Sequence, residues 1–198
     1  MEAARPQSSD NDPKSRLLRQ VARPRPRLID LQPLICELQQ RWQPPDQVEQ
    51  LLSSLAGLWQ LRFTTAEALS RFGVDQIPGL VERRRTYQFI DATNERVFNL
   101  AELALLGGAA QATTLIRARL QAGAIPRVYV RFERTALLWG GFDPYGSVEE
   151  AIRRIDGGEG GGVRLDIDSE GSLDTLYLDS QLRIAVGNRG SIFILTRP

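Results

Sequence analysis

The chain has 198 residues, which is enough for one domain of ordinary size with an extension. Hydrophobic residues make up 42% of it, so it can bury a sizeable core, and a net charge of +1 predicts no nucleic-acid partner. The sequence contains no histidine, which removes the commonest general base and the commonest metal ligand. Its single cysteine, Cys36, excludes an intrachain disulfide and a cysteine metal cluster.

Residues 1–27 are rich in Pro, Ser, Asp and Arg and poor in large apolar side chains. This composition predicts a disordered basic tail. Its basic run has no acid within it and consists of Lys14, Arg16, Arg19, Arg23, Arg25 and Arg27. Two interpretations stay open, an electrostatic arm for anionic headgroups and a merely solvated tail.

Two short helices are predicted over residues 28–56. The first has apolar residues at helical spacing, namely Leu31, Leu34, Ile35 and Leu38. After Pro44-Pro45, the spacing of Asp46 and Glu49 is that of a capping box, and Gly57 ends the second apolar face. These helices either pack on a β-barrel or present a docking face to a partner or a membrane.

From Gly57 onward the sequence consists of short alternating segments that predict a mainly β domain over 57–198. Strands are expected near 57–63, 86–90, 97–105, 112–121, 127–134, 163–167 and 173–177, with short helices near 65–72 and 147–155. Many short strands at regular spacing indicate a sandwich or a barrel, and the length of this region suits an eight-stranded barrel.

The last segment predicts a β-hairpin. Leu182, Ile184 and Val186 alternate with Arg183 and Ala185 before the turn at 187–190. A second alternating segment then follows over 192–197. This period and this turn chemistry are typical of two paired antiparallel strands.

Motifs for catalysis and metal binding are incomplete. The glycine run 157–162 lacks the Gly-Lys-Ser/Thr ending of a phosphate-binding loop. A calcium loop beginning at Asp166 would have Tyr177 where a bidentate carboxylate is needed. No nucleophile can pair with a histidine. We therefore predict no catalytic residue and no metal.

Three segments carry a resemblance to a known family. The last is Leu-Asp-Thr-x-Tyr-Leu-Asp-x-x-Leu-Arg-Ile, followed by Gly-Asn-x-Gly and Phe-x-Leu, within 173–195. The first is Leu-Ala-Gly-Leu-Trp over 55–59, and the middle one is Gln-Phe-Ile-Asp over 88–91 with Asn99 after it. Together they resemble the plastid-lipid-associated protein family, the fibrillins. The chain departs from the usual Arg-Gly before the last turn, where it has Val186-Gly187.

The resemblance implies a lipocalin-like antiparallel β-barrel preceded by short N-terminal helices. It also implies association with thylakoid membranes or lipid globules and binding of a carotenoid, a quinone or another lipid, with no required cofactor. In agreement with the incomplete catalytic motifs, the resemblance implies that the protein is not an enzyme. The short N-terminus favours a cyanobacterial member, located in the cytoplasm and peripheral on the thylakoid membrane. In a plant or alga, the location would be the plastid.

The candidate ligand-binding residues are Trp59, Arg131, Asp179 and Arg183. The three polar residues would orient an apolar molecule at the mouth of the barrel, and Trp59 is either a ligand contact or a core residue. For Arg183 a structural role is an alternative, since in lipocalin barrels an arginine from a last strand packs over the first-strand tryptophan, here Trp59. Trp139 and Phe142 would form an apolar lip that contacts lipid, or belong to a loop folded onto the barrel.

Three functions stay open. The first is a carrier of lipids or isoprenoids at the thylakoid surface. The second is a scaffold or assembly factor with a filled barrel that acts through its surface on a photosynthetic protein partner. The third is a lipocalin-like bilin lyase, which needs a bilin-sized pocket with a carboxylate or an arginine inside.

Overall fold

The computed structural model describes residues 12–66, 81–141, 147–158 and 161–198. The chain divides into two compact units, Met1–Gln43 and Pro44–Pro198. The first contains α1 (Pro13–Val21) and α2 (Leu28–Arg41), which contact each other. The second contains α3 (Val48–Leu55) and the barrel, so the two helices predicted over 28–56 belong to different units.

Helix α1 lies where the sequence analysis expected a disordered tail over 1–27. Asp12 begins the helix, because its carboxylate accepts a hydrogen bond from the backbone N–H of Ser15 at 3.2 Å. Pro13 follows in the first turn, where it needs no hydrogen-bond donor. Leu17 and Val21 lie one turn apart and are both buried. The prediction of disorder is therefore wrong for 13–21, since these few signals suffice for a helix that packs on α2.

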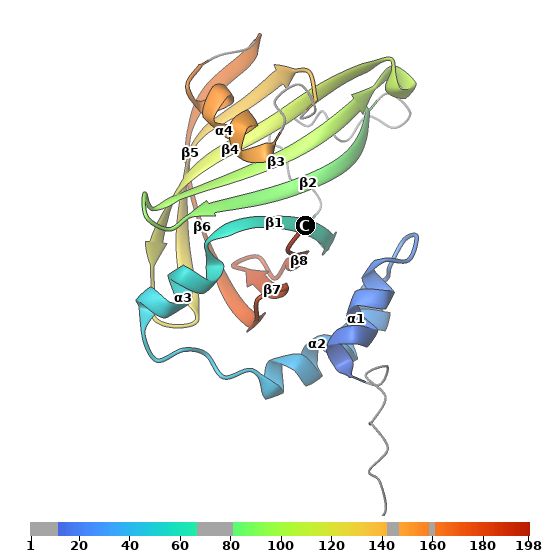
Figure 1. The fold of residues 1–198 in the computed structure, drawn as a ribbon, viewed down its shortest axis with the longest axis vertical. Coiled ribbons are helices and arrows are strands. Elements are labelled where there is room, and N and C mark those ends of the chain that lie inside the picture. Colours follow the sequence, from blue (N-terminus) through green and yellow to red (C-terminus); the bar gives the residue numbers. More distant parts are fainter. Residues whose placement is uncertain (1–11, 67–80, 142–146, 159–160) are drawn as a thin grey trace, which may run out of the picture. The chain divides into compact units, whose positions relative to one another are not determined.

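The second unit is a closed eight-stranded barrel in which every strand pairs antiparallel with its sequence neighbours and β1 pairs with β8 (Figure 1). This confirms the predicted fold class. The strands are β1 (Gly57–Thr64), β2 (Val81–Asp91), β3 (Arg96–Leu105), β4 (Ala110–Ala122), β5 (Arg127–Trp139), β6 (Gly162–Leu178), β7 (Leu182–Gly187) and β8 (Ile192–Thr196). A 3-10 turn, η3 (Leu106–Gly108), joins β3 to β4, and α4 (Val148–Asp156) lies between β5 and β6.

Strand β6 is continuous where the sequence predicted two strands. Its polar middle, with Ser169 and Gly171, pairs in register with Phe132 and Val130 of β5. The acidic residues of β6 bind arginines of β5, and the pairs are Arg134–Asp166 at 2.8 Å, Arg131–Asp168 at 3.0 Å and Arg127–Asp174 at 2.6 Å. These guanidinium groups lower the pKa values of Asp168 and Asp174. The polar segment between the two predicted strands is thus part of β6, and acidic residues of β6 form ion pairs with arginines of β5.

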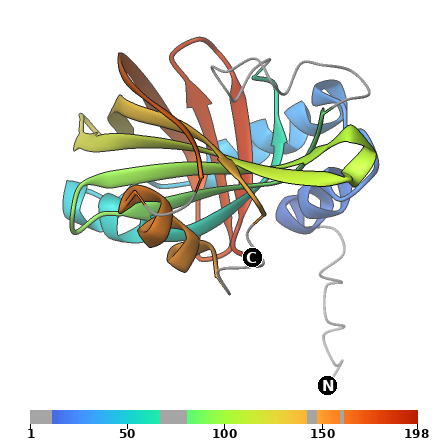
Figure 2. The same cartoon turned by 90° about the horizontal axis from the view of Figure 1, so that it is seen from above.

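Two apolar clusters stabilise the barrel. One fills the interior at the end covered by α3, where Leu51 and Leu55 pack against Trp59, Val97 and Val128. The other lies outside, where the apolar face of α4 packs against side chains of β2–β5 (Figure 2). The first cluster closes one end of the barrel, and the second covers the outer wall.

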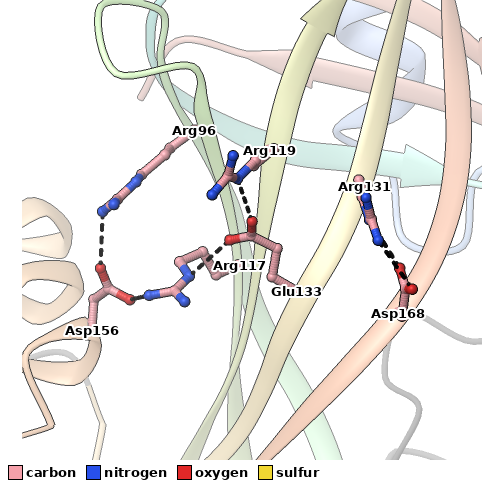
Figure 3. A network of polar contacts seen from close by, with 7 residues as sticks. All are labelled: Arg96, Arg117, Arg119, Arg131, Glu133, Asp156 and Asp168. Carbon is pink, nitrogen blue, oxygen red and sulfur yellow. Dashed lines mark hydrogen bonds and ion pairs between the residues drawn. The ribbon is translucent and has the colours of Figure 1, made fainter.

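A chain of charges fixes the end of α4 to the barrel wall (Figure 3). Asp156 of α4 accepts from Arg117 of β4 and from Arg96 of β3 at 3.4 Å. Glu133 of β5 lies 3.5 Å from Arg117 and 2.5 Å from Arg119. Because Asp156, Arg117 and Glu133 are partly buried and share partners, the network orients α4 more firmly than an isolated surface pair would.

Glu102 is a buried carboxylate, 3% exposed, that accepts from Nε of Arg85 at 2.8 Å and from Nη2 at 3.2 Å. We expect Arg85→Met to lower the free energy of unfolding by about 2 kcal/mol, since it leaves a buried charge without this partner, although the half-exposed arginine moderates the effect. Urea denaturation measures the loss. Adding Glu102→Gln to the same variant should restore part of it, and an equal loss in the double variant would contradict this assignment.

Candidate functional site

The barrel contains a cavity of about 430 Å³ that opens to solvent. Its apolar wall includes Leu61, Ile116, Val130, Phe132, Phe193 and Leu195. Asn188 and Arg189, in the exposed turn between β7 and β8, also line it and mark its mouth. The mouth therefore lies at the barrel end opposite to α3, because the β7–β8 turn and the start of β1 are at opposite ends.

A row of polar side chains crosses the cavity wall from β7 to β3. Arg183 donates from Nη1 to Oε1 of Gln88 at 2.6 Å, and Nε2 of Gln88 donates to Oδ1 of Asn99 at 2.9 Å. All three residues line the cavity. Gln88 and Asn99 face each other across the β2–β3 register. An apolar cavity with one short polar row is the usual design of a site that holds an apolar molecule in one orientation.

Arg183 is a buried cation without an acidic partner among the described residues. Its side chain is 1% exposed, and its one hydrogen-bond partner there is the neutral Gln88. Burial and the nearby charge of Arg197 lower the pKa of Arg183 to about 10. Arg183 therefore stays charged at neutral pH, at a cost on the order of 3 kcal/mol relative to a solvated guanidinium. A buried cation without an acidic partner, in the wall of a cavity, is a candidate functional residue.

The closed end of the barrel depends on Trp59 and Arg197. The guanidinium of Arg197 lies 3.8 Å from the ring centroid of Trp59. The arginine that packs over Trp59 is therefore Arg197, beyond β8, and the expectation that Arg183 does so is wrong. The same guanidinium donates to the carbonyl oxygens of Ala56 at 2.7 Å, Leu58 at 3.2 Å and Ser54 at 3.3 Å. Trp59 is fully buried, and its Nε1 donates to Leu55 O at 2.8 Å.

Gly57, two residues before Trp59, can take a side chain only if the guanidinium of Arg197 moves away from it. Its φ of +97° disfavours other residues, and an added Cβ would lie 2.7 Å from Nη1 of Arg197. We expect Gly57→Ala to lower the free energy of unfolding by about 2 kcal/mol, measured by urea denaturation. Gly190→Ala is the matched control, because φ is +78° there but nothing lies within 4 Å of the added Cβ. Equal losses in both variants would mean that backbone strain alone acts at Gly57.

The other candidate ligand-binding residues lie apart from Arg183. Arg131 is exposed on β5 and pairs with Asp168. Asp179 accepts from Tyr177 Oη at 2.8 Å and from the backbone N–H groups of Gln181 and Leu182, so it shapes the β6–β7 turn. Trp59, Arg131 and Asp179 do not line the cavity.

Trp139 ends β5, and its side chain is 61% exposed. Phe142 lies outside the described residues.

Gln88 and Asn99 carry part of the sequence resemblance, but alternation alone could not place them beside Arg183. Arg197 ends the alternating segment of the hairpin, but the sequence analysis gave it no role, since no local signal links it to Trp59.

The fold and its cavity define the class of protein, a lipocalin-like barrel. The PAP_fibrillin family model matches residues 20–196, and the chain belongs to this family. Searches of curated proteins and of solved structures found no match. Within the described residues, none of the helices combines the length and the apolarity that crossing a membrane requires. The same part of the chain holds no group of three or more metal-ligating side chains.

Proposed function

We propose that the protein binds an apolar small molecule, a quinone, a carotenoid or another lipid, inside its barrel and carries it without chemical change at thylakoid membranes or lipid globules. The observation that carries this proposal is the open cavity with its apolar wall and short polar row. Membership of the PAP/fibrillin family supports it.

The cavity volume limits the cargo. A cavity of about 430 Å³ lies within the range of about 300–1,000 Å³ that is usual for sites of drug-sized small molecules. A C40 carotenoid is larger than such ligands, so part of it would project from the mouth. A single acyl chain or a quinone head with a short tail fits inside. We therefore favour a small lipid or the head of a quinone over a fully enclosed carotenoid.

Exposed apolar side chains at the mouth end support transfer at a lipid surface. Leu106 is 65% exposed and Trp139 61% exposed, and Val163 and Leu165, near the start of β6, are also exposed. The ends of β3 and β5 and the start of β6 lie at the same end of the barrel as the β7–β8 turn. We infer that this end contacts the membrane or globule, with Trp139 inserted among the headgroups.

Mass spectrometry of an organic extract tests the carrier function on protein purified from a photosynthetic host. We expect a stoichiometric lipid or quinone from the wild type. Ala101→Leu narrows the cavity because Ala101 is buried and lines it, and this variant should carry less. Ala110→Leu, at an exposed position of β4, is the matched control. An extract of the wild type that contains no ligand would contradict the proposal, provided that a control carotenoid protein yields its pigment in the same procedure.

A scaffold function is the second candidate, because the interior cluster around Trp59 already fills the end of the barrel that α3 covers. In this case the protein would act through its surface on a photosynthetic protein partner. A wild type that yields clean extracts, but pulls down one stoichiometric partner from thylakoid extracts, would favour the scaffold over the carrier.

A further inference from the structure

The Nε–Nη2 edge of an arginine guanidinium binds carboxylates elsewhere in this chain, and in Arg183 the Nε of this edge has no hydrogen-bond partner among the described residues. Four arginines use Nε and Nη2 together to bind both oxygens of one carboxylate, and the pairs are Arg27–Asp30, Arg85–Glu102, Arg127–Asp174 and Arg131–Asp168. In Arg183, Nη1 is bound to Gln88. Its Nε is buried and has no hydrogen-bond partner in the described part of the chain. The edge that would bind a carboxylate therefore has no protein acceptor at Nε.

The charges around the cavity leave this cation uncompensated. No acidic side chain within the described ranges forms an ion pair with Arg183, and Arg197 adds a second positive charge nearby. Glu170 lines the cavity but is exposed. Arg189, at the mouth, is exposed as well. A buried, unpaired guanidinium is unfavourable, and an anion that enters the cavity would remove this penalty.

We propose that the cavity binds an amphiphile with a carboxylate head and a single apolar chain, and that Nε and Nη2 of Arg183 bind the carboxylate. Gln88 stays bound to Nη1, so it holds the guanidinium in place while the Nε–Nη2 edge binds the carboxylate. The apolar chain lies along the wall formed by residues such as Phe132 and Phe193. This inference rests on the carrier function, since it specifies the head group of the cargo.

A carboxylate suits the site better than a phosphate. One guanidinium offers one bidentate edge and one charge, which match a carboxylate. Because Arg197 does not line the cavity, a phosphate dianion would have one charge without a buried cation beside it in a largely apolar site. The volume of about 430 Å³ lies in the range of small-molecule sites, which suits a medium-chain fatty acid or a short isoprenoid acid.

Calorimetric titration of the full chain with dodecanoate and with dodecanol tests the proposal, because the two probes differ in the head group alone. We expect wild-type protein to bind dodecanoate at least about 10-fold more tightly than dodecanol at neutral pH. Arg183→Met should weaken dodecanoate binding by about 30-fold and leave dodecanol binding within about two-fold. Arg183→Gln, which keeps a polar side chain beside Gln88, should behave in the same way, and unchanged dodecanol binding shows that both variants are folded.

A spectroscopic signature separates direct contact from a structural role. The ¹³C shift of [1-¹³C]dodecanoate reports the pKa of its carboxyl group, which the wild type should lower on binding and Arg183→Met should not. Equal affinity for the two probes, or an equal loss of both in Arg183→Met, would overturn the inference while the carrier function stands. If neither probe binds the wild type, the inference fails, and the extraction experiment decides the carrier function independently.

Discussion

Trp59→Ala is expected to lower the free energy of unfolding by about 5 kcal/mol. The side chain is fully buried in the interior cluster beneath α3, and removing such an aromatic ring from a core costs about 3–5 kcal/mol. The variant also leaves Leu55 O without its donor and Arg197 without the ring on which it lies. Since a domain of this size is stable by about 5–15 kcal/mol, the variant should be close to unfolding at room temperature. Urea denaturation followed by circular dichroism measures the loss.

Trp59→Phe is the matched control, because it keeps an aromatic ring but removes the Nε1–H donor. We expect it to lose about 2 kcal/mol. A loss below about 2 kcal/mol for Trp59→Ala itself would mean that the closed end of the barrel contributes little to stability.

Arg197→Ala should produce the second-largest loss, about 3 kcal/mol in the same assay. Its guanidinium donates to three carbonyl oxygens and lies over the ring of Trp59. Two of those oxygens, Ser54 O and Ala56 O, belong to the C-terminal end of α3, where a cation also interacts favourably with the helix dipole. Hydrogen bonds from a charged donor contribute about 1.5–3 kcal/mol each, and the partial exposure of Arg197 reduces the sum.

Two controls isolate the role of this guanidinium. Arg197→Lys keeps the charge but not the planar fork, and should lose about half as much. Arg153→Ala, at an exposed position of α4, should change stability by less than about 0.5 kcal/mol. In a double-mutant cycle with Trp59→Leu, we expect a coupling energy of about 1 kcal/mol between Arg197 and the ring. A coupling near zero would contradict the stacking contribution.

The final hairpin could be predicted from the sequence because its signals are local, and the barrel could be predicted from the family resemblance. Alternation from Leu182 to Val186, the glycine-containing turn and the second alternating segment determine β7 and β8 without reference to other strands. The resemblance over 173–195 then indicated the closed barrel, which no single strand could have shown.

Strand β6 shows what local signals miss. Residues such as Ser169 and Gly171 favour turns when they are considered alone. Here β5 supplies backbone partners along this stretch, and Arg131 pairs with Asp168 across the strands. Pairing between strands therefore overrides the local preference, and that pairing is not readable from one strand.

The site residues show a similar limit. Arg183 and Arg197 are both arginines near the end of the chain, and one was expected to lie over Trp59. Alternation places Arg183 on a face of β7, but whether that face meets Trp59 or a cavity depends on the register around the whole barrel. The structure places Arg183 beside Gln88 and gives the contact with Trp59 to Arg197.

The pairing of β1 with β8 also has a consequence for synthesis on the ribosome. Arg197 binds Ala56 across 141 residues, so the contact that seals the barrel forms between its first and last parts. At about 5–20 residues per second, β1 emerges roughly 7–28 s before β8 exists. During that time β1 has an unpaired edge that could pair with another nascent chain. Chaperone binding to β1 during translation would protect it until the last strand arrives.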